Sequence, residues 1–245
     1  MKPYPMISAT VALLLTMTFS SSWGAMDIAP SALYLTILGG KIYDDWGREL
    51  KKKPPSETHP SYPSGSKKKG MDTWLCHECH GWDYQGKDGA FGDKTSPNYT
   101  GITGIRHWVG RDADPVVTLL RGEKHLYTQE MLSDQEIQAI ALFVTQGQME
   151  MEKYVQGEQI LGNPEKGKDF YQTICYRCHG IDGKKINFGT CKEPEYLGTL
   201  ARKNPFEVLH KIRNGQPGQD MITMAALPVT TQVDILAYVS RLPEN

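Results

Sequence analysis

Two short stretches of the chain place a pair of cysteines next to a histidine. The first runs from Cys76 to His80 and the second from Cys175 to His179, and both read C-x-x-C-H. Cysteines three positions apart lie on neighbouring faces of one helical turn, so their sulfurs can form thioether bonds to the two vinyl groups of one haem. The histidine that follows can bind the haem iron as its proximal ligand. The two motifs therefore predict two covalently bound haem c groups.

Other uses of paired cysteines fit this pattern less well. Cysteine pairs that share one structural zinc usually lie about 15–20 residues apart, whereas these pairs begin 99 positions apart (175 minus 76). A thioredoxin-like redox pair would need a βαβ setting, which the sequence pattern does not show. Disulfides within each pair would leave the two histidines unexplained. The predicted haem residues are thus the attachment cysteines Cys76, Cys79, Cys175 and Cys178 and the iron ligands His80 and His179.

The overall charge of the chain is close to zero. Its 27 Lys and Arg residues nearly balance 28 Asp and Glu residues among 245 residues. This balance gives no strong field that would attract nucleic acid or an acidic membrane surface. With 39% hydrophobic residues, the composition is typical neither of a disordered chain nor of a polytopic membrane protein.

The first 25 residues have the pattern of a secretory signal peptide. Lys2 precedes an apolar run over residues 7–19, and small residues follow up to Ala25, interrupted by Trp23. The apolar run is shorter than the roughly 20 residues that a membrane-spanning helix needs. We therefore expect residues 1–25 to be a signal peptide and the protein to be periplasmic. The alternative is an uncleaved N-terminus that anchors the protein to the membrane.

The rest of the chain reads as an internal repeat, in which each copy holds one motif and ends in a helix. Ser133 and Glu136 form a capping box that predicts a helix over residues 133–145. An amphipathic helix is predicted over residues 232–242, and a further helix is possible over residues 40–51. The expected division is an N-terminal extension (26–69), a first domain (70–150) and a second domain (151–245).

Around both motifs the sequence resembles the bacterial dihaem cytochromes c with two tandem class I cytochrome c domains. In the second copy, Gly167 to Tyr171 leads through a helical stretch into Cys175, and a glycine-rich turn follows His179. The resemblance implies an all-α fold of two tandem small helical domains, each wrapped around one covalent haem. In that family the distal iron ligand is usually a methionine from the loop before the last helix.

For the second haem, the resemblance implies Met221 as the distal ligand. Met221 ends a loop that begins near Ile212, and it stands 17 positions before Tyr238 of the closing helix. Met224 is the alternative, and a packing role in the core is open to both methionines. A thioether ligand favours ferrous iron and therefore raises the potential of the haem.

The first domain departs from the pattern of the family. Counting back 18 positions from Phe143 leads to His125 rather than to a methionine, and Met131 is only 12 positions back. We therefore predict His125 as the distal ligand of the first haem, with Met131 as the alternative. The remaining candidates are His59, His77 and His107.

The specialised residues of the chain all serve to hold haem, and no separate nucleophile or acid–base pair is evident. With both irons six-coordinate, we expect a carrier of single electrons between periplasmic or membrane-bound redox proteins, which bind it transiently. The alternative is a dihaem enzyme that oxidises or reduces a small substrate, such as thiosulfate or peroxide, at one haem. Cys191 is expected to be a buried or half-buried free thiol, the alternatives being an intermolecular disulfide or a role at the second iron.

Overall fold

The computed structural model describes residues 29–244, and the predicted signal peptide at residues 1–25 lies outside this part of the chain. The α-helices are α1 (Ala32–Leu50), α2 (Cys76–His80), α3 (Asp114–Arg121), α4 (Asp134–Leu142), α5 (Pro164–Phe170), α6 (Tyr176–His179), α7 (Leu197–Lys203), α8 (Pro205–Asn214) and α9 (Val229–Val239). The only strands among the described residues are the short antiparallel pair β1 (Val155–Gln156) and β2 (Gln159–Ile160). The predicted all-α fold is confirmed.

Short helical turns of other types extend or connect these helices. The 3-10 turns are η1 (Gly70–Trp74), η2 (Arg106–Trp108) and η4 (Met151–Lys153). The π-helical turns are η3 (Phe143–Gly147), which continues α4, and η5 (Tyr171–Cys175), which joins α5 to α6. Between residues 29 and 244, no helix is both long and apolar enough to cross a membrane.

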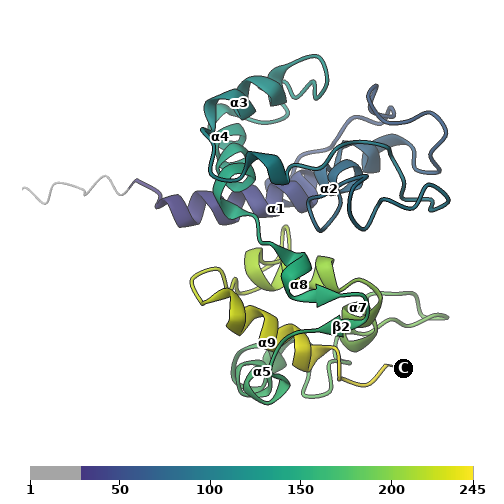
Figure 1. Ribbon diagram of the computed structural model, residues 1–245, viewed down its shortest axis with the longest axis vertical. Coiled ribbons are helices and arrows are strands. Elements are labelled where there is room, and N and C mark those ends of the chain that lie inside the picture. Colours follow the sequence, from purple (N-terminus) through teal and green to yellow (C-terminus); the bar gives the residue numbers. More distant parts are fainter. Residues whose placement is uncertain (1–28, 245) are drawn as a thin grey trace, which may run out of the picture.

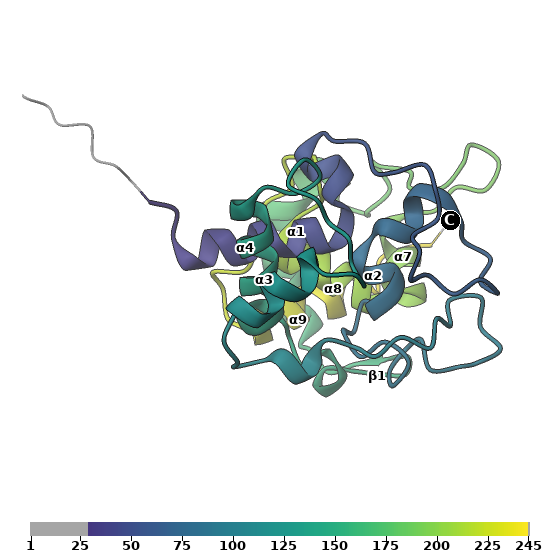
Figure 2. The ribbon, with the colours of Figure 1, turned by 90° about the horizontal axis from the view of Figure 1, so that it is seen from above.

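The elements are arranged as two halves, one above the other in Figure 1. The first half (residues 29–150) contains α1 to α4, and the second half (residues 151–244) contains α5 to α9. Seen from above, α1 and α4 lie over α8 and α9 (Figure 2). Each half therefore carries one C-x-x-C-H motif within its own set of helices.

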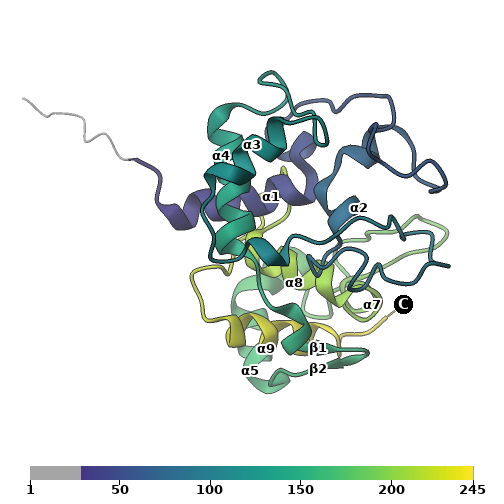
Figure 3. The same cartoon turned by 45° about the horizontal axis from the view of Figure 1, so that its top comes forward.

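In the first half, α1 and α4 pack directly on one another (Figure 3). They approach so closely at Gly39 that a Cβ atom there would lie 2.0 Å from the carbonyl oxygen of Ala139. α4 begins as predicted: the Ser133 hydroxyl accepts from the Glu136 backbone N–H at 3.4 Å, and a Glu136 carboxylate oxygen accepts from the Ser133 N–H at 2.6 Å. This capping box satisfies backbone donors that the first turn of a helix leaves free.

The second half repeats this packing with α5 and α9. A Cβ atom at Gly167 in α5 would lie 1.8 Å from the carbonyl oxygen of Asp234 in α9. Side chains larger than hydrogen cannot fit at such a crossing without moving the helices apart. The absence of a side chain at Gly39 and at Gly167 thus permits the same close helix pair in both halves.

The helix found within the expected extension is part of this packing. α1 begins at Ala32, eight positions before the expected start at residue 40, and the Ser31 hydroxyl caps it by accepting from the Tyr34 N–H at 3.1 Å. α1 packs on α4 as α5 packs on α9. The predicted boundary at residue 70 stays a prediction, but the helix that precedes it shares one core with the first motif.

A buried contact between α8 and the first half joins the two halves. His210 in α8 is fully buried; its Nε2 donates to the Gly40 carbonyl oxygen at 2.9 Å, and its Nδ1 accepts from the Tyr84 hydroxyl at 2.8 Å. A carbonyl oxygen can only accept, so the ring proton sits on Nε2. Burial, and then the charge of Lys211, lower the pKa of His210 to about 3. The contact is therefore made by a neutral imidazole.

Candidate haem sites

Aromatic side chains of neighbouring elements hold the start of the first motif. The Trp74 carbonyl oxygen, two positions before Cys76, accepts from the Trp46 indole N–H at 3.1 Å and from the Tyr127 hydroxyl at 2.7 Å. Trp46 belongs to α1, and Tyr127 to the loop between α3 and α4. These bonds fix the direction in which α2 leaves η1, and with it the direction of the cysteine side chains.

Each motif is followed directly by a glycine whose carbonyl oxygen accepts a hydrogen bond from a tyrosine hydroxyl. Gly81 and Gly180 have φ values of +76° and +83°, which residues with a Cβ atom rarely adopt. The Tyr43 hydroxyl donates to the Gly81 carbonyl oxygen at 2.6 Å, and the Tyr171 hydroxyl donates to that of Gly180 at 2.7 Å. The two motifs are therefore anchored in the same way.

A cavity of about 530 Å³ adjoins the first motif. It is lined by Cys76, Cys79 and His80 from the motif and by His125 from the loop after α3. The rest of its wall is mostly apolar and includes Tyr43, Leu75, Ile102, Ile105, Trp108, Val116, Leu119, Leu120, Tyr127, Ile140 and Val144. An apolar cavity with a few converging polar groups is the usual form of a cofactor site.

The imidazoles of His80 and His125 face each other across this cavity. Their ring centroids are 6.2 Å apart, and their planes differ by 31°. His80 Nδ1 donates to the Thr103 carbonyl oxygen at 2.9 Å, and His125 Nδ1 donates to that of Leu119 at 3.0 Å. Both Nε2 atoms are thereby left as acceptors, the arrangement that orients histidine ligands in metal sites.

Two further properties of these rings suit a shared metal ion. A metal about 2 Å from each of two opposed imidazole nitrogens places the ring centroids roughly 6 Å apart, close to the separation of 6.2 Å between His80 and His125. Burial lowers the pKa of His80 to about 4 and also lowers that of His125. Both rings are therefore neutral at pH 7, as metal ligation requires.

The other candidates for this position are placed differently. Met131 is not among the described residues that line the cavity, and its carbonyl oxygen accepts from Lys52 Nζ. His59 and His77 each use both ring nitrogens in hydrogen bonds within the protein. His107 lines the cavity but is exposed. The geometry thus favours His125 as the partner of His80.

Three of the four motif cysteines are not activated as thiolates. Burial raises the pKa of the Cys76 thiol to about 11, that of Cys79 to about 12 and that of Cys175 to about 11. Redox-active cysteine pairs have thiol pKa values below the ordinary one. For these three sulfurs the raised pKa values argue against the thioredoxin-like alternative.

A larger cavity, of about 990 Å³, adjoins the second motif. Cys175 and His179 line it together with Met221, whereas Cys178 is exposed and outside its described lining. Nδ1 of His179 is buried and has no hydrogen-bond partner among the described residues. Burial lowers the pKa of His179, so its ring is neutral. The predicted ligand pair His179 and Met221 thus shares one cavity.

The alternatives at the second site lie elsewhere. Met224 is buried, packs in the hydrophobic core and is not among the described residues that line the cavity. Cys191 is exposed and also absent from that lining. The expectation of a buried or half-buried Cys191 was wrong, because the loop between α6 and α7 holds it at the surface.

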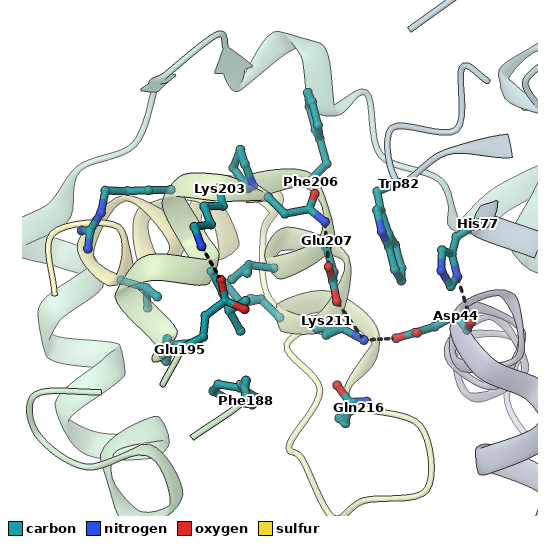
Figure 4. Close-up of a pocket in the computed structure, with 18 of the residues that line it drawn as sticks. Asp44, His77, Trp82, Phe188, Glu195, Lys203, Phe206, Glu207, Lys211 and Gln216 are labelled. Carbon is teal, nitrogen blue, oxygen red and sulfur yellow. Dashed lines mark hydrogen bonds and ion pairs between the residues drawn. The ribbon is translucent and has the colours of Figure 1, made fainter. Parts of the chain in front are cut away.

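The first half completes the wall of the second cavity. His77 and Trp82, within and just after the first motif, line it, and their rings are stacked with centroids 4.0 Å apart and planes 14° apart. Lys211 of α8 lies over the same indole at 5.2 Å and forms an ion pair with Asp44 of α1. Figure 4 shows His77 and Trp82 side by side, with the Lys211–Asp44 pair next to them.

Several of these positioning residues were not predicted from the sequence. Tyr43 and Tyr171 each stand four positions after a crossing glycine, in the stretches G-G-K-I-Y and G-K-D-F-Y. This shared G-x-x-x-Y spacing is a signal that could have identified α1 as the counterpart of α5. Trp82 and His210 carry no such signal, because their roles depend on how the two halves meet.

Taken together, the residues of both cavities fit a covalently bound haem c. Each cavity combines a C-x-x-C-H motif and a neutral imidazole with a second side chain able to bind iron. The wall of the first cavity is largely apolar, whereas that of the second also carries charged side chains such as Asp44, Glu195 and Lys211. In the first cavity that side chain is a histidine, and in the second it is a methionine.

Comparison with known proteins identifies part of the chain. Residues 164–241 match the family model of cytochrome c. The comparisons with curated proteins and with solved structures found no match. The matched segment begins at α5, includes the second motif and Met221, and ends just after α9. Residues 164–241 therefore correspond to a cytochrome c domain, a kind of domain that in its family binds haem c covalently and serves in haem-based electron transfer.

Proposed function

We propose that the chain is a dihaem c-type cytochrome that carries single electrons between redox partners. The observation that carries this proposal is the facing pair His80 and His125, which supplies the first cavity with two neutral imidazoles beside the cysteines Cys76 and Cys79. The first half thus has the attachment sites and ligands that a second haem needs, although the cytochrome c family model matches only the second half.

The proposed iron ligands are His80 and His125 in the first half and His179 and Met221 in the second. When bound, haem supplies one-electron redox chemistry, and the protein sets its potential through the ligands and the wall of the cavity. Backbone carbonyl groups orient the two imidazoles of the first site. The mostly apolar wall of the first cavity limits the access of water to its site, and this access is one of the factors that set the potential of a bound haem.

The arrangement of the halves supports electron exchange between the two sites. His77 lies between the attachment cysteines of the first motif, and the ring stacked on it, Trp82, lines the second cavity. A short, packed contact of this kind shortens the gap across which an electron must pass. His210 and the Lys211–Asp44 pair join the two halves beside this contact.

The location and partners belong to the same proposal. The N-terminal pattern supports export to the periplasm through a signal peptide, which is the compartment where haem attached through thioethers is commonly used. The partners would be periplasmic or membrane-bound redox proteins that dock transiently, as redox encounters usually do.

Binding of carbon monoxide to the reduced protein tests this function. If both irons have two protein ligands, carbon monoxide should bind slowly and weakly at neutral pH, while electrons exchange quickly with small redox proteins. Rapid carbon monoxide binding together with turnover of thiosulfate or peroxide would show an open catalytic haem and would overturn the carrier function. The absorption spectrum of the ferric protein, which separates low-spin from high-spin haem, provides an independent readout.

A further inference from the structure

A loop from the long segment between α1 and the first motif contacts the loop that carries His125. The His59 ring donates through Nε2 to the His125 carbonyl oxygen at 3.0 Å, and the Ser61 hydroxyl donates to the Lys124 carbonyl oxygen at 2.8 Å. Two consecutive carbonyl groups of the ligand loop are thus bound by one short segment. His59 and Ser61 also line the first cavity.

His59 is itself fixed from several directions. Its backbone N–H donates to the Thr73 hydroxyl at 2.8 Å, and its Nδ1 accepts from the Ser61 N–H at 3.1 Å. Because Nδ1 accepts, the ring proton is on Nε2, which must donate to His125. The ring packs edge-on against Trp74 with centroids 4.3 Å apart and is only 7% exposed. A residue this constrained can hold another one in place.

The ligand loop needs support of this kind. Leu126, directly after His125, has φ of +58°, a left-handed conformation that costs a non-glycine residue roughly 1–2 kcal/mol. His125 lies between α3 and α4 and belongs to neither helix. Within the loop, the His125 and Leu126 N–H groups donate to the Gly122 carbonyl oxygen at 3.1 and 2.9 Å, and His125 Nδ1 donates to that of Leu119. The bonds from His59 and Ser61 are different in kind, because they tie the loop to another segment of the chain.

We infer that His59 and Ser61 are positioning residues that clamp the loop of His125 and so keep the distal side of the first iron closed to outside ligands. His59 also links this loop to Thr73 and Trp74, which lead into Cys76. The clamp therefore ties the distal side of the first site to the segment that places the proximal motif. This inference rests on the proposed role of His125 as an iron ligand.

Substitutions that remove the clamp test the inference in the full, haem-loaded chain. His59→Leu removes the donor at similar size, and His59→Gln retains an N–H that can reach the same carbonyl group. Ser61→Ala removes the second bond. Ser66→Ala is a matched control from the same loop, since among the described residues the Ser66 side chain makes no bond to the ligand loop. The readouts are the high-spin fraction of the ferric spectrum and the rate of carbon monoxide binding to the reduced first haem.

We expect His59→Leu to raise the rate of carbon monoxide binding about fivefold and to increase the high-spin fraction. The loss of one hydrogen bond shifts the equilibrium between the closed and the open ligand loop by about this factor. The double variant with Ser61→Ala should exceed this effect, whereas His59→Gln and Ser66→Ala should resemble the wild type. If a folded His59→Leu protein with both haems keeps the wild-type spectrum and binding rate, the clamp is disproved.

A separate variant distinguishes failure of the clamp from failure of the ligand assignment. His125→Leu should convert the first haem to a high-spin form that binds carbon monoxide rapidly. If it does so while His59→Leu has no effect, only the clamp is wrong. If His125→Leu itself leaves the low-spin spectrum unchanged, His125 is not a ligand, and both the proposed ligation and the clamp fail.

Discussion

The two halves of the molecule share a framework but differ in the loops that complete their cavities. In both halves, a glycine within the first helix of the pair lets two helices cross closely. A tyrosine four positions after that glycine donates to the carbonyl oxygen of a second glycine, the one that directly follows the C-x-x-C-H motif. Tyr171 stands only 4 positions before Cys175, whereas Tyr43 stands 33 positions before Cys76 (175 minus 171 and 76 minus 43). The inserted segment supplies side chains to the first cavity.

This difference explains how each site is closed. The first half builds its cavity from its own residues, with the insert contributing His59, Ser61 and Thr73. The second half, with no such insert, takes part of its wall from the first half, including His77 and Trp82. The framework therefore positions the motif, while the loops determine the distal ligand and what surrounds it.

Substitution of the crossing glycines should have the largest effect. In Gly39→Ala and Gly167→Ala the new methyl group would meet a backbone carbonyl oxygen at 2.0 Å and 1.8 Å, so each variant should lose about 3 kcal/mol of stability in denaturant unfolding. Gly65→Ala is the control, since a Cβ atom there has nothing within 4 Å. Equal losses in both halves would support the shared framework, and wild-type stability of either variant would break it.

Exchange of the distal ligands should shift the haem potentials in opposite directions. Met221→His should lower the potential of the second haem, and His125→Met should raise that of the first, because a thioether favours ferrous iron. The shift should be on the order of 0.1 V, within the roughly 0.8 V range that axial ligands span. A redox titration should resolve two steps in the wild type, the lower one from the first haem. A single step in the wild type would contradict the difference between the halves.

Loss of the buried contact between the halves should cost less than the glycine substitutions. His210→Leu leaves the Tyr84 hydroxyl and the Gly40 carbonyl group buried without their partner, which should lower the stability by about 2 kcal/mol. Denaturant unfolding at neutral pH measures this loss. An unchanged stability would mean that the halves are held together without His210.

His210 also predicts a dependence of stability on pH. Its pKa is about 3 in the folded protein, below the ordinary value of 6.5, so between these values the unfolded chain binds a proton that the folded chain does not. Stability should therefore fall as the pH is lowered through this window. His210→Gln should show a shallower fall over the same range. Parallel curves for the two proteins would show that His210 does not titrate on unfolding.

The smallest effect is expected at the lysine run of residues 51–53. Lys52 donates to the Met131 carbonyl oxygen and forms an ion pair with Glu136 at 3.0 Å, whereas Lys53 is exposed. Lys52→Ala should lower the melting temperature slightly, by the equivalent of about 0.5 kcal/mol, and Lys53→Ala should leave it unchanged. Identical melting of the two variants would show that the insert gains nothing from this pair.

Much of the framework could be predicted from the sequence, because its signals are local. The motifs, the capping box at Ser133 and the closing helix each occupy one short stretch. α1 was predicted only in part, since the long insert separates it from Cys76 and its pairing with α4 is a contact between distant segments. The roles of Trp82 and His210 arise from the packing of one half on the other, which no local pattern specifies.

The number of haems bound to the intact chain tests the dihaem assignment most directly. Mass spectrometry of the denatured protein should show two haem additions in the wild type, since thioether bonds survive unfolding. Replacing Cys76 and Cys79 by alanine should remove one addition, and replacing Cys175 and Cys178 should remove the other. A single addition in the wild type, lost only when Cys175 and Cys178 are replaced, would contradict a haem in the first half.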